Sequence, residues 1–496
     1  MRPLSFSRWQ LTGFVAGLAV FFALAFLDSP LKDHPEWGNR PAYAAAGASL
    51  MAIWWLTEAV SIYVTACVPL VLFPALGVFG PSTAENVRAS ASEYFNAYIF
   101  LFAGGMGVAA AMQQWNLHRR IALTIMDRVG SEPRRLLWGF LAATAFISLW
   151  ISNTATAAML LPIGIALIAQ VEEQLAAQSG VPRRLEHYGM AVMLAIAYGS
   201  NVGGVGTKIG TAPNAMFSGV MEQQGLPISF LQFLVVGLPF VVLFLPLVAL
   251  MLWRIGRRDG LRGEVGAGVV QEQLAGLGPI ARPERIVLGV FLVTAALWIA
   301  SNWITGFLEP RVPWKLTSAQ VEGTIAMLAA LTLLVWRTGG GPVLGWTALK
   351  KVPWETLLLL GGGFAMAAAI QGSGLSDWTG QQLLAVRGLP PFVQVLLASV
   401  VVVALSAVAS NTATIAVMLV VLRDAVSPEI LPTVLFAATI ASSCDFALPA
   451  GTPPNAIVFG SGYVSIPRMA KTGVVLDLAA AVLAAVWCWL IVRWVL

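Results

Sequence analysis

The sequence predicts an all-α polytopic membrane protein with about eleven transmembrane helices and two opposed re-entrant hairpins in an inverted repeat. Composition is the first reason, because the 496 residues are 58% hydrophobic and only 11% charged, whereas soluble domains carry roughly 25% charged residues. Mean hydropathy is +0.79, and apolar stretches long enough to cross a bilayer recur along the chain. The second reason is a polar motif that occurs twice in apolar surroundings.

The repeated polar motif is Ser-Asn-Thr. Its two copies begin at Ser152 and Ser410, an offset of 258 residues, and each follows a glycine cluster with the same offset. Each copy is followed by a closing motif, which reads GTAPNA from Gly210 and GTPPNA from Gly451, an offset of 241 residues. A doubled polar motif of this kind is typical of a transporter built from two repeats, with its binding site between them.

Hydropathy and helix breakers place the membrane segments in order. The first apolar run follows two arginines like a signal peptide, but no small-residue cleavage site comes after it, so we expect a spanning helix. An amphipathic stretch at 116–130 follows the fourth span. The expected spans lie near 11–28, 43–57, 60–79, 97–115, 229–254, 284–304, 318–337, 357–372 and 472–495.

Two apolar blocks, 134–170 and 390–425, contain the Ser-Asn-Thr copies, and each could form two full spans or one hairpin ending at membrane depth. The positive-inside rule favours hairpins, because most of the 29 Lys and Arg residues then fall on the cytoplasmic side together with the N-terminus. The first hairpin would enter from the cytoplasm and the second from the opposite side. Broken helices at 188–222 and 430–463 would complete the two repeats.

The predicted organisation follows from these segments. Residues 97–254 form the first repeat core and residues 357–496 the second, each with one hairpin and one broken helix. Residues 1–96 and 284–356 supply mainly scaffold spans. Residues 255–283 are rich in Arg and Gly and form a cytoplasmic linker.

Charge, cysteine content and motifs argue against several function classes. The net charge of +5 comes from basic residues in short loops, which set membrane orientation and do not indicate nucleic-acid binding. The three cysteines have no paired spacing, so neither a disulfide framework nor a zinc site is expected. No ATP-binding motif is present, so an ion gradient or a counter-substrate must supply the energy for transport.

Two other classes remain as alternatives. A membrane-embedded enzyme needs an acid, a base, a nucleophile or a metal in one cavity, and Lys208 and Asp445 are the obvious candidates. A proton antiporter of similar inverted-repeat design usually needs paired carboxylates within the membrane, and only Asp445 presents itself. Both classes are weaker explanations of the duplicated motif than transport of an anion.

The Ser-Asn-Thr copies suit an anion and a cation alike. Irregular backbone at membrane depth persists only where it is buried in protein or lines a watery cavity. Amide N–H groups at the start of a half-helix favour a carboxylate or sulfate, and free carbonyl groups favour a small cation. Pro213 and Pro453 prevent the closing segments from resuming helical hydrogen bonding. In the alternative interpretation, each motif only hydrogen-bonds to neighbouring helices, but its duplication with a Pro-Asn partner argues against this.

These motifs, together with WLTEAVSIYVTACVPLVLFP from Trp55 onward, resemble the divalent anion/sodium symporter family of dicarboxylate, citrate and sulfate carriers. The resemblance covers nearly the whole chain. It implies an eleven-span fold with two opposed hairpins, a homodimer, and elevator-like movement of a transport domain against a scaffold domain. It also implies that sodium ions accompany the substrate.

The resemblance assigns roles to the matching positions. A small dianionic substrate would be bound by Ser152, Asn153, Thr154, Thr211, Ser410, Asn411, Thr412, Thr452 and Pro453. One sodium ion would be held by Ser152, Asn153 and the Gly210 carbonyl, and a second by Ser410, Asn411 and the Gly451 carbonyl.

Two charged residues, Lys208 and Asp445, depart from the family pattern, which has uncharged residues at these places. Charged groups at membrane depth are costly and usually functional, so both are candidates for cation coupling. Three interpretations compete. The two residues form an ion pair across the repeat interface, or Lys208 replaces a bound sodium ion while Asp445 carries a proton or another cation, or one or both reach the cavity surface without a role.

The expected function is secondary active transport of C4-dicarboxylates such as succinate, malate or fumarate, coupled to a cation. Hydroxyl and amide groups bind dicarboxylate, citrate and sulfate alike, so a citrate or sulfate transporter and a proton-coupled or exchanging carrier remain alternatives. We expect an integral protein of a bacterial inner membrane, with the lipid bilayer and a second copy of the chain as partners and no nucleic acid.

Overall fold

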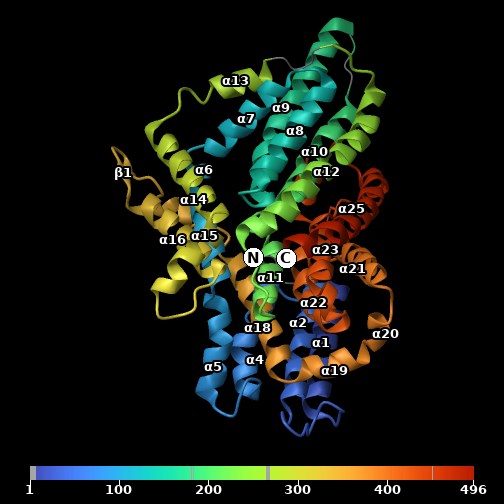
Figure 1. Cartoon of the computed structure of the whole chain (residues 1–496). Coiled ribbons are helices and arrows are strands. Elements are labelled where there is room, and N and C mark those ends of the chain that lie inside the picture. Colours follow the sequence, from blue (N-terminus) through green and yellow to red (C-terminus); the bar gives the residue numbers. More distant parts are fainter. Residues whose placement is uncertain (1–6, 180, 182–183, 264–267, 450) are drawn as a thin grey trace.

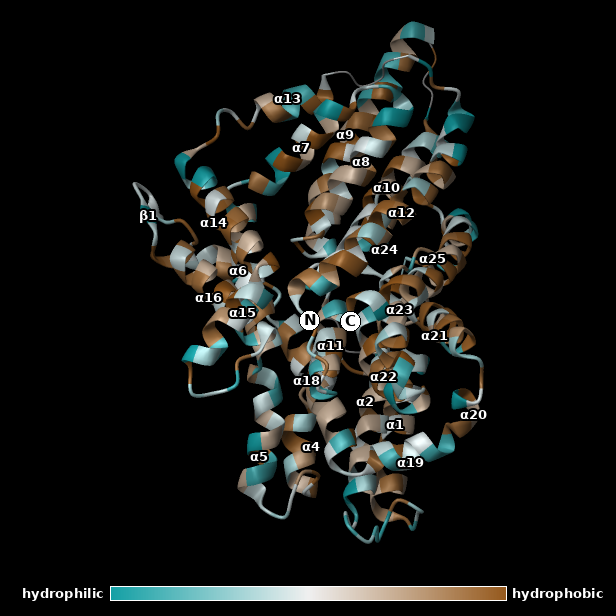
Figure 2. Ribbon diagram, in the orientation of Figure 1, coloured by the Kyte–Doolittle hydropathy of each residue, from teal (hydrophilic) through white to brown (hydrophobic). Residues whose placement is uncertain are grey.

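The computed structural model describes residues 7–179, 181, 184–263, 268–449 and 451–496. Helices dominate this part of the chain, and its single strand ladder is the short antiparallel pair β1 (Arg337–Thr338) and β2 (Gly341–Pro342). This confirms the predicted all-α polytopic fold. Figure 2 shows hydrophilic residues gathered at the two ends of the molecule and hydrophobic residues along the helices between them.

The first half of the described chain contains the elements of one repeat core and the spans that precede it. In order these are α1 (Arg8–Phe26), α2 (Arg40–Thr57), α3 (Ile62–Thr65), α4 (Val68–Leu76), α5 (Thr83–Ser92), η1 (Glu93–Phe95), α6 (Ala97–Gln114), α7 (Leu117–Val129), α8 (Pro133–Ser148), α9 (Asn153–Ser179), α10 (Glu186–Gly204), α11 (Ala212–Gln223), α12 (Phe230–Gly256) and η2 (Arg257–Asp259).

The second half repeats this order after a short linker helix. Its helices are α13 (Val269–Ala275), α14 (Arg282–Ile299), α15 (Ser301–Leu308), η3 (Glu309–Arg311), α16 (Ser318–Val335), α17 (Trp346–Leu349), α18 (Glu355–Gly372), α19 (Leu375–Gln382), α20 (Leu384–Arg387), α21 (Pro391–Ser406), α22 (Asn411–Ala425), η4 (Pro428–Ile430), α23 (Leu431–Ser443), α24 (Pro453–Phe459) and α25 (Ile466–Val495).

The lengths of the helices differ from those of the spans that hydropathy predicts. Among the described residues, seven helices are long and apolar enough to cross a membrane, or up to eight if the bent pair α14 and α15 counts as one span. That pair bends by 66° at Ala300, whereas the sequence predicts one uninterrupted segment there. Three further apolar segments, Ile62–Leu76, Pro391–Ser406 and Pro428–Ser443, are shorter. The count of about eleven spans therefore stays a prediction.

The two segments that carry Ser-Asn-Thr each fold as a pair of helices joined by a short turn. Helices α8 and α9 are joined by residues 149–152, and α21 and α22 by residues 407–410. Figure 1 shows α8 and α9 in the half of the molecule that holds α7 and α13, and α21 and α22 in the half that holds α19 and α20. The two turns thus approach the middle of the molecule from different sides.

The two broken segments are each interrupted by a break that contains glycine or proline. Helix α10 ends at Gly204 and α11 begins at Ala212, while α23 ends at Ser443 and α24 begins at Pro453. Helix α8 packs directly on α10, and a Cβ atom at Gly203 would overlap the backbone of Ala145. This close approach fixes the first hairpin against the broken helix that carries its closing motif.

Candidate functional site

One cavity of about 220 Å³ lies where the two hairpin turns and the two closing motifs meet. Every predicted substrate residue lines it, although the motifs are separated by 258 and 241 positions in the sequence. The volume is below the roughly 300–1,000 Å³ of pockets for drug-sized ligands, so the cavity suits a small solute. Its polar lining includes Tyr63, Ser152, Asn153, Thr154, Asn201, Thr211, Thr356, Ser410, Asn411, Thr412 and Thr452, with Gly210, Gly451 and Pro453 beside them.

Helix N-termini point their free amide groups toward this cavity. Helix α9 begins at Asn153 and α22 begins at Asn411, so the two Ser-Asn-Thr motifs straddle helix starts. Helix α11 begins just after Thr211, which also lines the cavity. The first amides of a helix have no partner within the helix and carry partial positive charge, so the cavity can stabilise an anion without basic side chains.

The Pro-Asn residues of the closing motifs hold the helix breaks in place. Asn214 Nδ2 donates to the carbonyl groups of Gly204 at 2.9 Å and Thr207 at 2.6 Å. Asn455 Nδ2 donates to the carbonyl of Leu448 at 3.0 Å. Both asparagines belong to the closing motifs, but the motifs alone did not predict a role for them. The doubled Pro-Asn pair was the available signal.

Asn201 joins the two repeats and is a residue that the sequence analysis missed. Its Nδ2 donates to the backbone carbonyl of Asp445 at 3.1 Å and lies 3.1 Å from Thr452 Oγ1. Asn201 is fully buried in α10, yet it contacts the second closing motif. The only signal in the sequence was an amide side chain within an apolar helix. The partners of Asn201 lie about 250 residues further along the chain, so a local sequence pattern cannot identify them.

The predicted sodium residues are packed closely together in the first repeat. A Cβ atom at Gly204 would overlap the side-chain amide of Asn153, and one at Gly210 would overlap the backbone of Gly204. Asn153 Oδ1 accepts a hydrogen bond from Ser148 Oγ at 2.7 Å. In the second repeat Asn411 Oδ1 is buried, and no described residue hydrogen-bonds to it. Oxygen atoms of this kind are the ligands that hard cations prefer.

Lys208 lies in the break between α10 and α11 and is fully buried. Its Nζ is 2.6 Å from Glu322 Oε2 on α16 and donates to the carbonyl of Ile228 at 2.5 Å. Glu322 Oε1 in turn accepts from the amide of Phe230 at 2.6 Å and from Ser301 Oγ at 2.9 Å. Both charges are therefore fully compensated within a hydrogen-bonded network.

The interpretation that Lys208 pairs with Asp445 is wrong, because Glu322 occupies the place of that partner. Glu322 was not singled out by sequence reasoning, although a glutamate inside the apolar segment 318–337 was the signal. Lys208 does not line the cavity. Whether either charge takes part in cation coupling stays a prediction.

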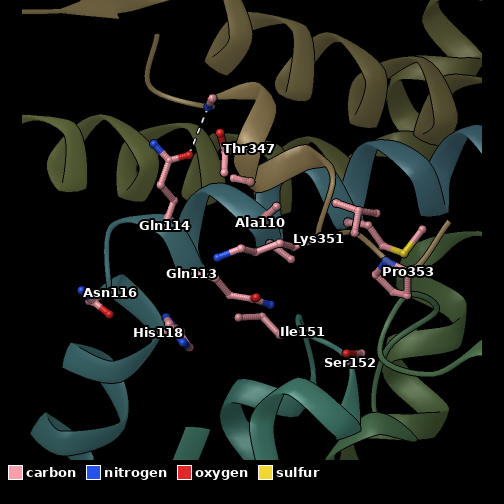
Figure 3. Close-up of a pocket in the computed structure, with 15 residues that line it drawn as sticks. Ala110, Gln113, Gln114, Asn116, His118, Ile151, Ser152, Thr347, Lys351 and Pro353 are labelled. Carbon is pink, nitrogen blue, oxygen red and sulfur yellow. Dashed lines mark hydrogen bonds between the residues drawn. The ribbon is translucent and has the colours of Figure 1, made fainter. Parts of the chain in front are cut away.

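A second, larger cavity of about 660 Å³ opens beside the first and is called the vestibule here. Ser152 lines both cavities, together with Met106, Ala109 and Pro353. Figure 3 shows Lys351 and Gln113 extending into the vestibule, with His118 on its far wall. The two cavities therefore adjoin at the first hairpin turn.

His118 contributes no charge to the vestibule at neutral pH. Its ring is buried and its Nδ1 lies 3.1 Å from the carbonyl of Met112. Desolvation by burial lowers the pKa of His118 from 6.5 to about 4. The exposed Lys351 is thus the cationic side chain that lines the vestibule within the described residues.

The lowered pKa of His118 predicts a pH effect on stability. The folded state disfavours the protonated ring, so the stability that the neutral ring provides is complete above pH 6.5 and is lost as the pH falls toward 4. We expect the Tm of the purified protein to fall between pH 6.5 and 4, and less steeply in His118→Gln. Equal slopes for the two proteins in thermal melts would contradict this.

The sequence of nearly the whole chain matches a known protein family. The model of the sodium:sulfate symporter transmembrane region matches residues 10–495. The chain belongs to this family. The resemblance to divalent anion/sodium symporters is thereby confirmed, and the protein is an integral membrane transporter rather than an enzyme.

Relatives within the sodium:sulfate symporter family are similar over almost their whole length. The sodium-dependent dicarboxylate transporter SdcS of Staphylococcus saprophyticus is 35% identical over 486 residues, covering 96% of this chain and 90% of SdcS. SdcS of Staphylococcus aureus is 36% identical over 489 residues with the same coverage. The crystal structure of the YdaH transporter of Alcanivorax borkumensis has a TM-score of 0.54 at 13% identity over 98% of each chain, a likeness of fold alone.

Proposed function

We propose that this family member is a sodium-coupled symporter of C4-dicarboxylates such as succinate, malate and fumarate. The observation that carries the proposal is the single small cavity lined by both Ser-Asn-Thr motifs and both closing motifs. Each repeat contributes one group of hydroxyls, amides and helix N-termini to the cavity. Two such groups match a solute with a carboxylate at each end. The sodium-dependent dicarboxylate transport named for SdcS agrees with this assignment.

The charge of the cavity favours co-transport of a cation. The described residues that line it include no Lys, Arg, Asp or Glu, so a bound dianion has no side-chain counter-charge. A net double charge in a low-dielectric site is costly. Sodium ions bound at the hairpin turns would offset this charge, and they would leave with the dianion when the site opens.

The vestibule supports an alternating-access cycle. It lies beside α7 and α17, next to basic residues that the positive-inside rule assigns to the cytoplasm. We infer that the described conformation is open to the cytoplasm, and that an elevator movement of the hairpins and broken helices against scaffold spans 1–96 and 284–356 carries the site across. The homodimer, the bacterial inner membrane and the cytoplasmic N-terminus belong to the same proposal.

Uptake into proteoliposomes tests the function. Purified protein should accumulate labelled succinate when sodium is higher outside, and should not when potassium or choline replaces sodium. Excess malate or fumarate should compete, whereas citrate and sulfate should not. Accumulation driven equally well by a proton gradient or by internal anion would contradict sodium symport, and competition by citrate or sulfate alone would contradict the proposed substrate.

Lys351 is expected to raise the local concentration of the dianion in the vestibule. Lys351→Gln should increase the KM for succinate several-fold at low ionic strength, and the difference should shrink as salt screens the charge. The matched control is Lys350→Gln, because Lys350 is also exposed but does not line the vestibule. Equal KM values for the two variants at low salt would show that Lys351 does not guide the substrate.

A further inference from the structure

The second repeat differs from the first by a carboxylate placed where the cation pocket of the first repeat has only glycine. The offset of 241 residues that relates Gly210 to Gly451 also relates Gly204 to Asp445. In the first repeat, a Cβ atom at Gly204 would overlap the amide group of Asn153. The equivalent position in the second repeat carries the side chain of Asp445, and the residue equivalent to Asn153 is Asn411.

The carboxylate of Asp445 lies against the closing motif of its own repeat. A Cβ atom at Gly451 would overlap both carboxylate oxygens of Asp445, so only glycine leaves room for this side chain. The backbone carbonyl of Asp445 is held by Asn201 at 3.1 Å and by Asn455 at 3.2 Å. The side chain is thus fixed beside the Gly451 backbone that lines the cavity.

Several buried oxygen atoms near the second closing motif have no side-chain hydrogen-bond partner within the part of the chain that the structure describes. Asp445 is fully buried, and within the described residues no side chain donates to either of its carboxylate oxygens, although the amide of Ala447 lies beside it. Ser443 Oγ and Asn411 Oδ1 are also buried, and neither has a hydrogen-bond partner among the described residues. A buried carboxylate with no counter-charge is costly, and a bound cation would remove that cost.

We propose that Asp445 is a direct ligand of a sodium ion in the second repeat, and that this ion binds before the dicarboxylate. Carboxylate, amide and hydroxyl oxygens are the ligands of a hard cation. The neighbouring Asp477 already accepts a hydrogen bond from the amide of Phe446 at 2.8 Å. This leaves the carboxylate of Asp445 as the free negative charge, and one such charge matches a monovalent ion. The first pocket has no such charge, since glycine stands at the equivalent position, Gly204.

The two repeats would therefore bind their cations at different stages. The second pocket becomes neutral when it takes sodium, so it needs no anion for stable occupancy. The first pocket offers only uncharged oxygens, so its ion is held in part by the dianion itself. This inference deepens the proposed function and rests on it for the order of binding, but the ligand role of Asp445 is measurable without any dicarboxylate.

Binding of radioactive sodium to the purified full-length protein, without dicarboxylate, tests the ligand role. The wild type should bind sodium, and Asp445→Asn should lower its sodium affinity at least tenfold. Asp477→Asn is the matched control, a buried aspartate facing the same break that should keep sodium affinity within about twofold. Wild-type sodium affinity in Asp445→Asn, or in Asp445→Gly, which copies the first repeat, would overturn the proposal.

A second measurement does not depend on any variant. Sodium chloride should raise the Tm of the wild-type protein in the absence of anion by more than potassium chloride does at equal concentration. The lack of a sodium-specific shift would overturn the proposal even if both Asp445 variants failed to fold. If sodium binds but succinate is not transported, the proposed substrate fails and the ligand role of Asp445 stands.

Discussion

Replacing Asn153 or Asn411 by alanine is expected to weaken succinate binding by about tenfold to a hundredfold each, and the double replacement should abolish uptake. Each asparagine stands at a helix start on the cavity wall, where its amide can contact the dianion or its sodium ion. A hydrogen bond to a charged group is worth about 1.5–3 kcal/mol, which corresponds to these factors. Equilibrium binding and proteoliposome uptake of labelled succinate measure the effect.

The control for these variants is Asn302→Ala. The amide of Asn302 donates to Ser229 Oγ at 3.0 Å, away from the cavity, so uptake should stay close to that of the wild type. If Asn153→Ala/Asn411→Ala transported succinate at the wild-type rate, the two hairpin turns would not form the substrate site.

Lys208→Ala is expected to have the largest effect on stability, about 3–5 kcal/mol, because it leaves Glu322 charged and buried without its partner. Lys208→Met/Glu322→Gln removes both charges and should recover most of that loss. A double-mutant cycle on the free energy of unfolding of the purified protein measures the coupling between the two side chains. Additive effects of the single replacements would show that the pair is not coupled.

The same ion pair has a consequence for transport. It joins the break between α10 and α11 to α16, and α16 packs chiefly on α6. If the hairpins and broken helices move against α16, the pair must separate in each cycle. We therefore expect Lys208→Ala to weaken uptake or to change its cation dependence. Unchanged uptake with the same sodium response would limit the pair to a structural role.

Much of the site could be predicted because both of its halves carry the same short motif. The offsets between the Ser-Asn-Thr copies and between the closing motifs place four polar segments at equivalent positions, and all four line one cavity. Helix starts at Asn153 and Asn411 follow from the same repeat.

Other features depend on contacts that no local pattern shows. Lys208 and Glu322 are 114 residues apart, so the lysine revealed a buried charge but not its partner. Asn201 reaches Thr452 of the second closing motif across 251 residues. The bend between α14 and α15 occurs in a continuous apolar segment. Hydropathy predicts how long such a segment is, but it does not predict whether the helix axis changes direction within it. The vestibule is formed by α6, α7 and α17 together, and its shape arises only from packing.

A cryo-electron microscopy map of the purified protein with succinate and sodium would test the central claim most directly. Density for one elongated anion should lie between Ser152-Asn153-Thr154 and Ser410-Asn411-Thr412, with each carboxylate at one hairpin turn and an ion beside Asp445. Anion density confined to the vestibule, or contact with only one of the two turns, would contradict it.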